Sequence, residues 1–294
     1  MTYRVSHSTR YAYGTEVQLA AHMLHLRPRP LPWQRVLSER LVVEPAVTRR
    51  RDGVDHFGNA VTWLFMDTPH AAFVVTGESR IDVCAPIPPP AATTPPWETV
   101  AALARVGGPD AWHAAEFAFG SAMAPAHAGA GAYAGDSFTP GRPVLEGLLD
   151  LNRRICREFT FRAGVTTVST PIDLVLERRE GVCQDFTHLM LGALRALGLP
   201  ARYVSGYIRT RPPPGTVRRR GADTSHAWVG CWLGPRHGWV DLDPTNGLVV
   251  RDEHVVLGWG RDYDDISPVR GVILGGGVQT LSVGVDLEPE ETAA

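Results

Sequence analysis

The sequence predicts an α+β protein in which a small β-sandwich domain precedes a larger part that mixes helices and strands. Three observations support this fold class. Residues 1–84 contain short strand-like segments without a convincing helix, a proline-rich segment follows them, and amphipathic helices then lead into a run of strands. We therefore expect a β-sandwich domain at 1–84, a linker at 85–97 and a larger domain at 98–290. A chain of 294 residues is long enough to bury both cores.

The β domain is predicted from alternating and β-branched segments. Residues 2–13 alternate polar and apolar side chains, and residues 41–43 have strand-like composition. In the segment 55–66 a Gly-Asn turn leads into a strand, and residues 71–83 supply a further strand. Several short strands of this kind are typical of a small β-sandwich.

The segment 85–97 is rich in proline, which disfavours helices and central strands and is typical of a stiff linker or a surface strap. After it, helices are expected at 97–105, 111–123 and 143–159, with a loop at the glycine- and alanine-rich residues 124–135.

The helix expected at 183–197 is the best defined in the chain. Its apolar residues follow the i, i+3, i+4 spacing on one face, and Gly198 with Pro200 ends it. Strands are then expected at 201–208, 225–233 and 238–244. A last hairpin at 269–289 is expected to end the larger domain.

The composition is that of an ordinary globular protein, with 44% hydrophobic and 20% charged residues. A net charge of -2 argues against a nucleic-acid partner. No apolar stretch is long enough to span a bilayer, and the N-terminus lacks a signal-peptide core, so we expect a cytoplasmic protein without a membrane partner. The four cysteines lack metal-site spacing and are expected to be reduced. The arginine-rich residues 209–220 are interpreted as a solvated loop.

Cys183 begins the expected helix 183–197 and is the most informative residue. Backbone N–H groups without partners and the helix dipole favour a thiolate in the first turn of a helix. Gly181, two residues earlier, allows a tight turn and a close substrate approach. A lone cysteine is more often a small buried hydrophobe, and we keep that interpretation for the other three cysteines. For Cys183, later motifs around His226 and Asp243 favour a nucleophile instead.

The segments containing His226 and Asp243 are expected to pair as a hairpin, because only four residues separate their strands. If Leu233 pairs with Gly238, Asp243 lies opposite Trp228. That position is on the same face of the sheet as His226 and one diagonal step from it.

The same register excludes Asp241 as the partner of His226. Asp241 would lie opposite Gly230, four residues from His226, or roughly 13 Å at about 3.4 Å per residue. A register shift of one residue would move Asp243 to the other face. The alternative interpretation of Asp243 is a turn-forming residue ahead of Pro244.

Together these motifs resemble the bacterial branch of the transglutaminase-like family. The resemblance is carried by GVCQDFTHLM at 181–190, LRALGLPARYVSGYI at 194–208, SHAWVGCWL at 225–233 and GWVDLDPTNG at 238–247, and it extends to GRDYDDISPVRGV at 260–272. It implies a papain-like core, in which the helix carrying the cysteine packs on an antiparallel sheet carrying the histidine and the aspartate, preceded by the family's β domain. It also implies a catalytic triad of Cys183, His226 and Asp243.

Such a triad implies a cysteine-dependent peptidase or amidase acting on a peptide or protein. Cys183 would attack the amide carbonyl, His226 would protonate the departing amine, and Asp243 would orient the imidazole. Water would then resolve the acyl thioester. Two alternatives stay open: a protein-glutamine transamidase, in which an amine resolves the thioester, and a non-catalytic peptide-binding module.

The resemblance also supplies candidate substrate contacts, which are Asp185, Trp228, Arg261 and Tyr263. Asp185 and His188 lie three residues apart on one helix face and are expected to pair and brace the helix start. A zinc site formed by Cys183 with nearby histidines would lack paired ligand spacing, so we expect neither a metal nor any other cofactor.

Overall fold

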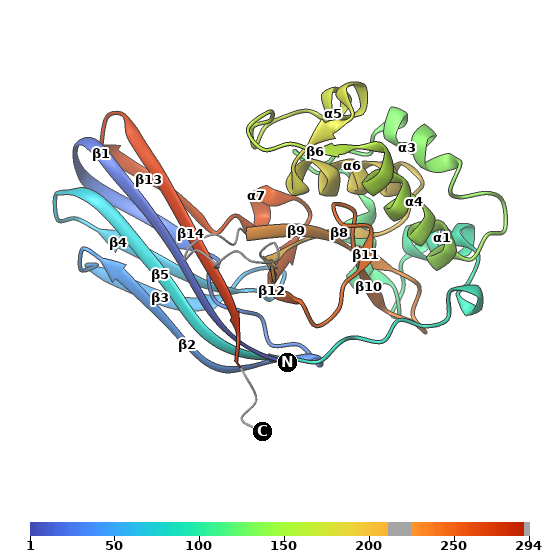
Figure 1. Cartoon of the computed structure of the whole chain (residues 1–294), viewed down its shortest axis with the longest axis horizontal. Coiled ribbons are helices and arrows are strands. Elements are labelled where there is room, and N and C mark those ends of the chain that lie inside the picture. Colours follow the sequence, from blue (N-terminus) through green and yellow to red (C-terminus); the bar gives the residue numbers. More distant parts are fainter. Residues whose placement is uncertain (211–224, 291–294) are drawn as a thin grey trace, which may run out of the picture.

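Two antiparallel sheets and a layer of helices form the protein (Figure 1). The computed structural model describes residues 1–210 and 225–290, so most of the arginine-rich segment lies outside the described residues. Within these ranges, no helix is long and apolar enough to cross a membrane. The α-helices are α1 (Trp97–Val106), α2 (Trp112–Ala115), α3 (Ala128–Gly135), α4 (Val144–Glu158), α5 (Ile172–Arg178), α6 (Cys183–Ala196) and α7 (Tyr263–Ile266).

The expected N-terminal β domain is present as a seven-stranded sheet. Its order is β2-β5-β1-β4-β3, and two further strands pair with β1. Apolar side chains from β1, β2, β4 and β5 share one buried cluster, so the sheet closes over a core of its own. The strands are β1 (Thr2–Leu24), β2 (Gln34–Glu44), β3 (Arg49–Val54), β4 (Ala60–Met66), β5 (His70–Val83), β13 (Val269–Gly275) and β14 (Gln279–Pro289).

The C-terminal hairpin of β13 and β14 belongs to this sheet, and its assignment to the larger domain was wrong. β14 pairs antiparallel with β1 from Tyr3 opposite Pro289 onward, and β13 pairs with the second half of β1. In Figure 1 the hairpin runs beside β1, far from α4 and α5. The physical reason is the length of β1, whose second edge would otherwise present unpaired backbone groups to solvent.

The second sheet has the order β11-β10-β9-β8-β12; β8, β9 and β10 are the three expected strands, and β11 and β12 were not predicted. α6 packs on β8 and β9 and is covered in turn by α3 and α5 (Figure 1). The strands are β8 (Ala201–Ile208), β9 (Ser225–Trp232), β10 (Trp239–Asp243), β11 (Leu248–Val249) and β12 (His254–Gly260). A short parallel pair, β6 (Thr160–Phe161) and β7 (Glu180–Gly181), precedes α6.

Two expectations for the segment before α4 differ from the structure. The helix expected at 111–123 is shortened to α2 and a 3₁₀ turn, η2 (Glu116–Ala118), and a second 3₁₀ turn, η1 (Ala91–Thr93), lies in the linker. The chain turns back at Gly120, where a Cβ would lie only 2.9 Å from the Ala126 nitrogen. The expected loop contains α3, because Gly131 lets this helix approach α6 closely. A Cβ at Gly131 would lie 2.7 Å from Ala196 Cβ.

The two sheets are joined by a shared core. Apolar residues of β1, β5 and β14 in the N-terminal sheet form one buried cluster with residues of β8 and β12 in the second sheet. Within it, His7 Nδ1 lies 2.8 Å from the hydroxyl of Tyr207. The N-terminal sheet therefore supports the sheet that carries the histidine and the aspartate.

Candidate active site

The start of α6 places Cys183 at a helix N-terminus, as expected. Asp185 folds back over the first turn, where its Oδ2 accepts hydrogen bonds from the Val182 nitrogen and from Thr166 Oγ1, both at 2.7 Å. Gly181 is required for this arrangement, because a Cβ there would lie 2.8 Å from Asp185 Oδ2. Burial raises the pKa of Asp185 against these hydrogen bonds. The Asp185 cap and the space at Gly181 therefore set where α6 starts, and with it the position of the thiol.

The predicted register between β9 and β10 is confirmed. Asp241 lies opposite Gly230, and the Leu233 nitrogen donates to the Gly238 oxygen at 2.8 Å. As a result, Asp243 reaches His226, whose Nε2 lies 2.7 Å from Asp243 Oδ2.

His226 contacts Asp243 through Nε2 and lies close enough to Cys183 at the start of α6 for the two groups to interact electrostatically. Burial alone would lower the pKa of His226, but the interactions with Asp243 and with Cys183 outweigh it and raise the pKa to about 10. The ring is therefore an imidazolium at neutral pH, which is suited to stabilise a thiolate and to protonate a leaving amine.

Asp243 is completely buried and is held by five donors. Its Oδ1 accepts from the backbone nitrogens of Thr245 and Asn246 at 2.9 and 3.2 Å. Its Oδ2 accepts from Asn246 Nδ2 at 2.7 Å and faces both His226 Nε2 and, at 3.3 Å, His254 Nε2. Burial alone would raise the pKa of Asp243, but the hydrogen bonds from His226 and His254 dominate and hold it well below its usual range. Asp243 is therefore a buried carboxylate that stays ionised, and it also forms the turn foreseen ahead of Pro244.

His254 is the site residue that the sequence analysis missed. It begins β12, and its Nδ1 has no hydrogen-bond partner among the described residues. A proton on that buried Nδ1 would be an unsatisfied donor, so we assign the proton to Nε2, which donates to Asp243. The local signal in the sequence was a histidine at the start of an apolar segment, and the pairing of that segment with β8 comes from the fold.

His226, Asp243 and His254 also form the one cluster of potential metal ligands among residues 1–210 and 225–290. Their ligand atoms lie within 4.8 Å of one another and all three side chains are buried. Each of these atoms already takes part in the hydrogen bonds on Asp243, so an ion here would break the contact between His226 and Asp243.

Trp228 packs beside His226, with 6.0 Å between the ring centres, and Asp241 is bonded to Trp228 and not to His226. Trp228 has no exposed surface, and its Nε1 donates to Asp241 Oδ2 at 3.1 Å. A side chain without exposed surface cannot contact a substrate in this arrangement, so Trp228 is a support beneath His226. Asp185 is buried in the helix cap, away from His188, and the pair expected between these two residues is not formed.

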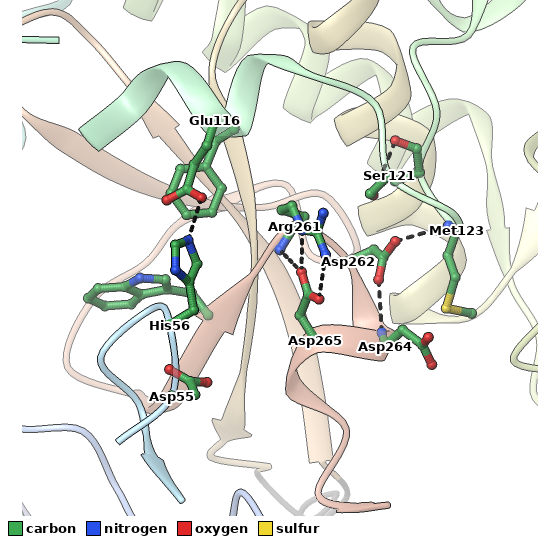
Figure 2. Close-up of polar contacts among 12 residues, drawn as sticks. Asp55, His56, Glu116, Ser121, Met123, Arg261, Asp262, Asp264 and Asp265 are labelled. Atoms are coloured by element: carbon green, nitrogen blue, oxygen red, sulfur yellow. Dashed lines mark hydrogen bonds and ion pairs between the residues drawn. The ribbon is translucent and has the colours of Figure 1, made fainter. Parts of the chain in front are cut away.

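Arg261 and Tyr263 lie on the segment that enters α7. Figure 2 shows Arg261 turned toward Asp265, with Nε and Oδ2 at 2.8 Å. The Tyr263 nitrogen donates to His188 Nε2 at 3.3 Å, and its ring lies 6.2 Å from that of Tyr203. Burial lowers the pKa of His188 to about 4, so this histidine is neutral. Arg261 remains half-exposed, while Tyr263 is partly buried beside α6.

A cysteine at the start of a helix, packed on an antiparallel sheet that presents a histidine and an aspartate, defines the transglutaminase-like class of α+β folds. Comparison with known families agrees. Residues 3–82 match the bacterial transglutaminase-like N-terminal region, and residues 132–244 match the transglutaminase-like superfamily.

Relatives extend this match to nearly the whole chain. An uncharacterized protein of Mycobacterium tuberculosis is 40% identical over 98% of this chain and 93% of its own, and one of Mycobacterium leprae is 31% identical over 97% of each. A protein-glutamine gamma-glutamyltransferase of Pseudomonas aeruginosa is 34% identical over 88 residues, which are 30% of this chain and 13% of that protein. The chain belongs to the bacterial transglutaminase-like family.

A solved structure has the same fold. It is a protein from Cytophaga hutchinsonii described provisionally as a cysteine protease, with a TM-score of 0.78 and 20% identity, covering 100% of this chain and 92% of that one. At this identity the likeness concerns the fold alone.

Proposed function

We propose that the protein is a cysteine-dependent peptidase or amidase that forms an acyl thioester on Cys183. One observation carries the proposal. His226 Nε2 lies 2.7 Å from Oδ2 of the buried Asp243, and the interaction of the ring with Asp243 and with Cys183 raises its pKa. These three groups supply a nucleophile, a proton donor and an orienting anion.

In the proposed reaction, the thiolate of Cys183 attacks the carbonyl carbon of a peptide or carboxamide. Backbone N–H groups in the first turn of α6 have no intrahelical partners, so the Cys183 nitrogen is placed to stabilise the oxyanion. The His226 imidazolium protonates the departing amine as the C–N bond breaks. Neutral His226 then accepts a proton from water as the water attacks the thioester, and Asp243 holds the ring throughout.

Selective alkylation tests the activated thiol. Cys84 is exposed, whereas Cys183 is partly buried, so access alone would favour Cys84. We expect iodoacetamide at neutral pH to modify Cys183 first, as judged by mass spectrometry, and the Cys183→Ala variant to lose only that fast event. If Cys84 reacts as fast as Cys183 or faster, the protein is better described as a peptide-binding module.

Transamidation is the second candidate, and one observation favours it. Part of the chain resembles a protein named as a protein-glutamine gamma-glutamyltransferase. A glutamine-containing peptide, supplied with and without a primary amine, separates the two reactions. Hydrolysis gives the same glutamate product in both mixtures, whereas transfer gives an amine adduct. We expect hydrolysis, because water needs no acceptor pocket.

A further inference from the structure

A cavity of about 610 Å³ lies where loops of the N-terminal sheet meet the second sheet. We call it the junction pocket. Four tryptophans and two phenylalanines contribute to its lining: Trp33, Trp112, Trp239, Trp259, Phe57 and Phe117. Trp112 is 70% exposed, which is unusual for so large an apolar side chain. At the edge of the pocket, Figure 2 shows His56 from the N-terminal sheet bonded to Glu116 at 2.8 Å.

A buried cation forms part of the pocket lining. The Arg202 guanidinium lies 3.7 Å from the ring centre of Trp259 and 4.3 Å from that of Trp239, while Arg29 lies 3.6 Å from Trp259. Arg202 is only 4% exposed, and burial lowers its pKa to about 10, so it remains charged at neutral pH. Stacked cations and indoles hold these aromatic walls in place.

The free hydrogen-bonding groups of the pocket include donors from its indoles. Arg202 does not supply one, because its buried Nε lies against Gly230 and its Nη2 pairs with Asp241 Oδ1 at 3.7 Å. The indole N–H groups of the four lining tryptophans have no acceptor among the residues that the structure describes. Glu116, the carboxylate of the lining, already accepts from His56. A complementary ligand would therefore offer acceptors and flat apolar surfaces, and few donors.

Proline-rich peptide fits this description. Proline has no N–H, so a polyproline II segment presents free carbonyls and ring faces. An adjoining cavity is lined by Trp33 and Trp239 together with Pro86, Pro88 and Pro89 of the linker, so prolines already lie near these indoles. The same two indoles also line the junction pocket.

We propose that the junction pocket binds a proline-rich segment of another protein in the polyproline II conformation. Its carbonyl oxygens would accept from the indole N–H groups, while its rings pack on Trp112, Trp239 and Trp259. This is the mode in which aromatic-lined grooves recognise such segments. The site is independent of the chemistry at Cys183, and occupancy would bring a proline-rich protein against the junction of the two sheets.

Calorimetry with the full chain tests the proposal. The Cys183→Ala protein is titrated with a capped decaproline peptide and with a capped Gly-Ser peptide of equal length, so that turnover plays no part. We expect binding of decaproline only. Trp112→Ala, an exposed position that the fold tolerates, should weaken binding at least tenfold, because loss of one stacking aromatic removes a large share of such an interface.

Phe161→Ala is the matched control, since Phe161 is a 56% exposed aromatic on β6 and outside the pocket lining. It should leave the affinity unchanged. Absence of decaproline binding, or equal binding by the Trp112→Ala protein, would overturn the proposal. So would binding of chitotetraose in place of decaproline, which would identify the indoles as a carbohydrate platform.

Discussion

Asp243 is the residue on which the candidate triad depends, because it is an ionised group with no exposed surface. Five donors around one carboxylate explain how this charge is tolerated inside the protein. Asp241 lies only two residues away, but it accepts a hydrogen bond from Trp228 and forms an ion pair with Arg202 instead. Residues two apart lie on the same face of a strand, so it is the distance along β10 that separates these two roles.

The variant Asp243→Asn should slow alkylation of Cys183 at pH 7 by about tenfold or more, because His226 loses the charge-assisted hydrogen bond that raises its pKa. The measurement is the pseudo-first-order rate with iodoacetamide. Asp241→Asn is the matched control and should retain the rate, although it destabilises the protein by removing the partner of Arg202. A slow Asp241→Asn protein beside a fast Asp243→Asn protein would reverse the roles of the two aspartates.

His254 is a positioning residue in this scheme, since it acts through Asp243. His254→Leu should lower the alkylation rate of Cys183 by about tenfold, the equivalent of one buried hydrogen bond to a charged group. It should also move the upper limb of the pH–rate profile to higher pH, because His254 no longer shares Asp243 Oδ2 with the His226 imidazolium. His254→Gln keeps a donor and should restore the profile. A uniform loss of rate with an unmoved profile would indicate a purely structural role.

The raised pKa of His226 predicts how stability depends on pH. A group whose pKa is higher in the folded state stabilises that state fully below its unfolded pKa, and the contribution is lost as pH rises through the folded value. For His226 these limits are about 6.5 and about 10. The wild type should therefore exceed His226→Gln in urea midpoint at pH 6, and the difference should shrink by pH 10. A difference that grows with pH would contradict the assigned imidazolium.

At the scale of elements, the start of α6 depends on the cap formed by Asp185. Asp185→Ala should lower the free energy of unfolding by about 1–2 kcal/mol, since it removes a cap and leaves the Val182 N–H without its acceptor. Urea denaturation measures this loss. Asp173→Ala removes an exposed carboxylate from the first turn of α5 and should change stability by at most about 0.5 kcal/mol. Equal losses in both variants would show that the Asp185 cap contributes no more to stability than an exposed carboxylate in the first turn of a helix.

Elements set by local pattern could be predicted from the sequence. The helix expected at 183–197 is α6, Cys183–Ala196, and the hairpin register that selected Asp243 holds. Both depend on nearest neighbours: apolar spacing in one case, and a short connection in the other. The position of Asp243 beside His226 was therefore accessible, and its catalytic role stays a prediction.

Features set by distant parts of the chain could not be predicted in this way. The hairpin of β13 and β14 pairs with β1, which lies at the other end of the chain, and no local pattern predicts that pairing. The glycine-rich residues 124–135 predict a loop, because glycine disfavours helices, yet Gly131 allows close packing of α3 on α6. His254 reaches Asp243 only because β12 lies beside β8, a neighbour far away in sequence.

At the scale of the molecule, the two sheets should unfold together, because residues of both form one buried cluster. Leu287 of β14 is completely buried in it. Leu287→Ala should cost about 2–5 kcal/mol, the usual effect of a large-to-small change in a core. It should lower the unfolding temperature equally for tryptophan fluorescence, which reports mainly on the second sheet and its helices, and for hydrogen exchange in β1 and β5.

Leu281→Ala provides the matched control, since Leu281 lies on the same strand but is 54% exposed. Its effect should stay within about 0.5 kcal/mol. Two separate transitions, with only the β1 and β5 amides shifted by Leu287→Ala, would contradict a common core. A single shifted transition would mean that the N-terminal sheet stabilises the sheet holding His226 and Asp243. A destabilising substitution in β14 would then also destabilise the candidate active site through the shared core.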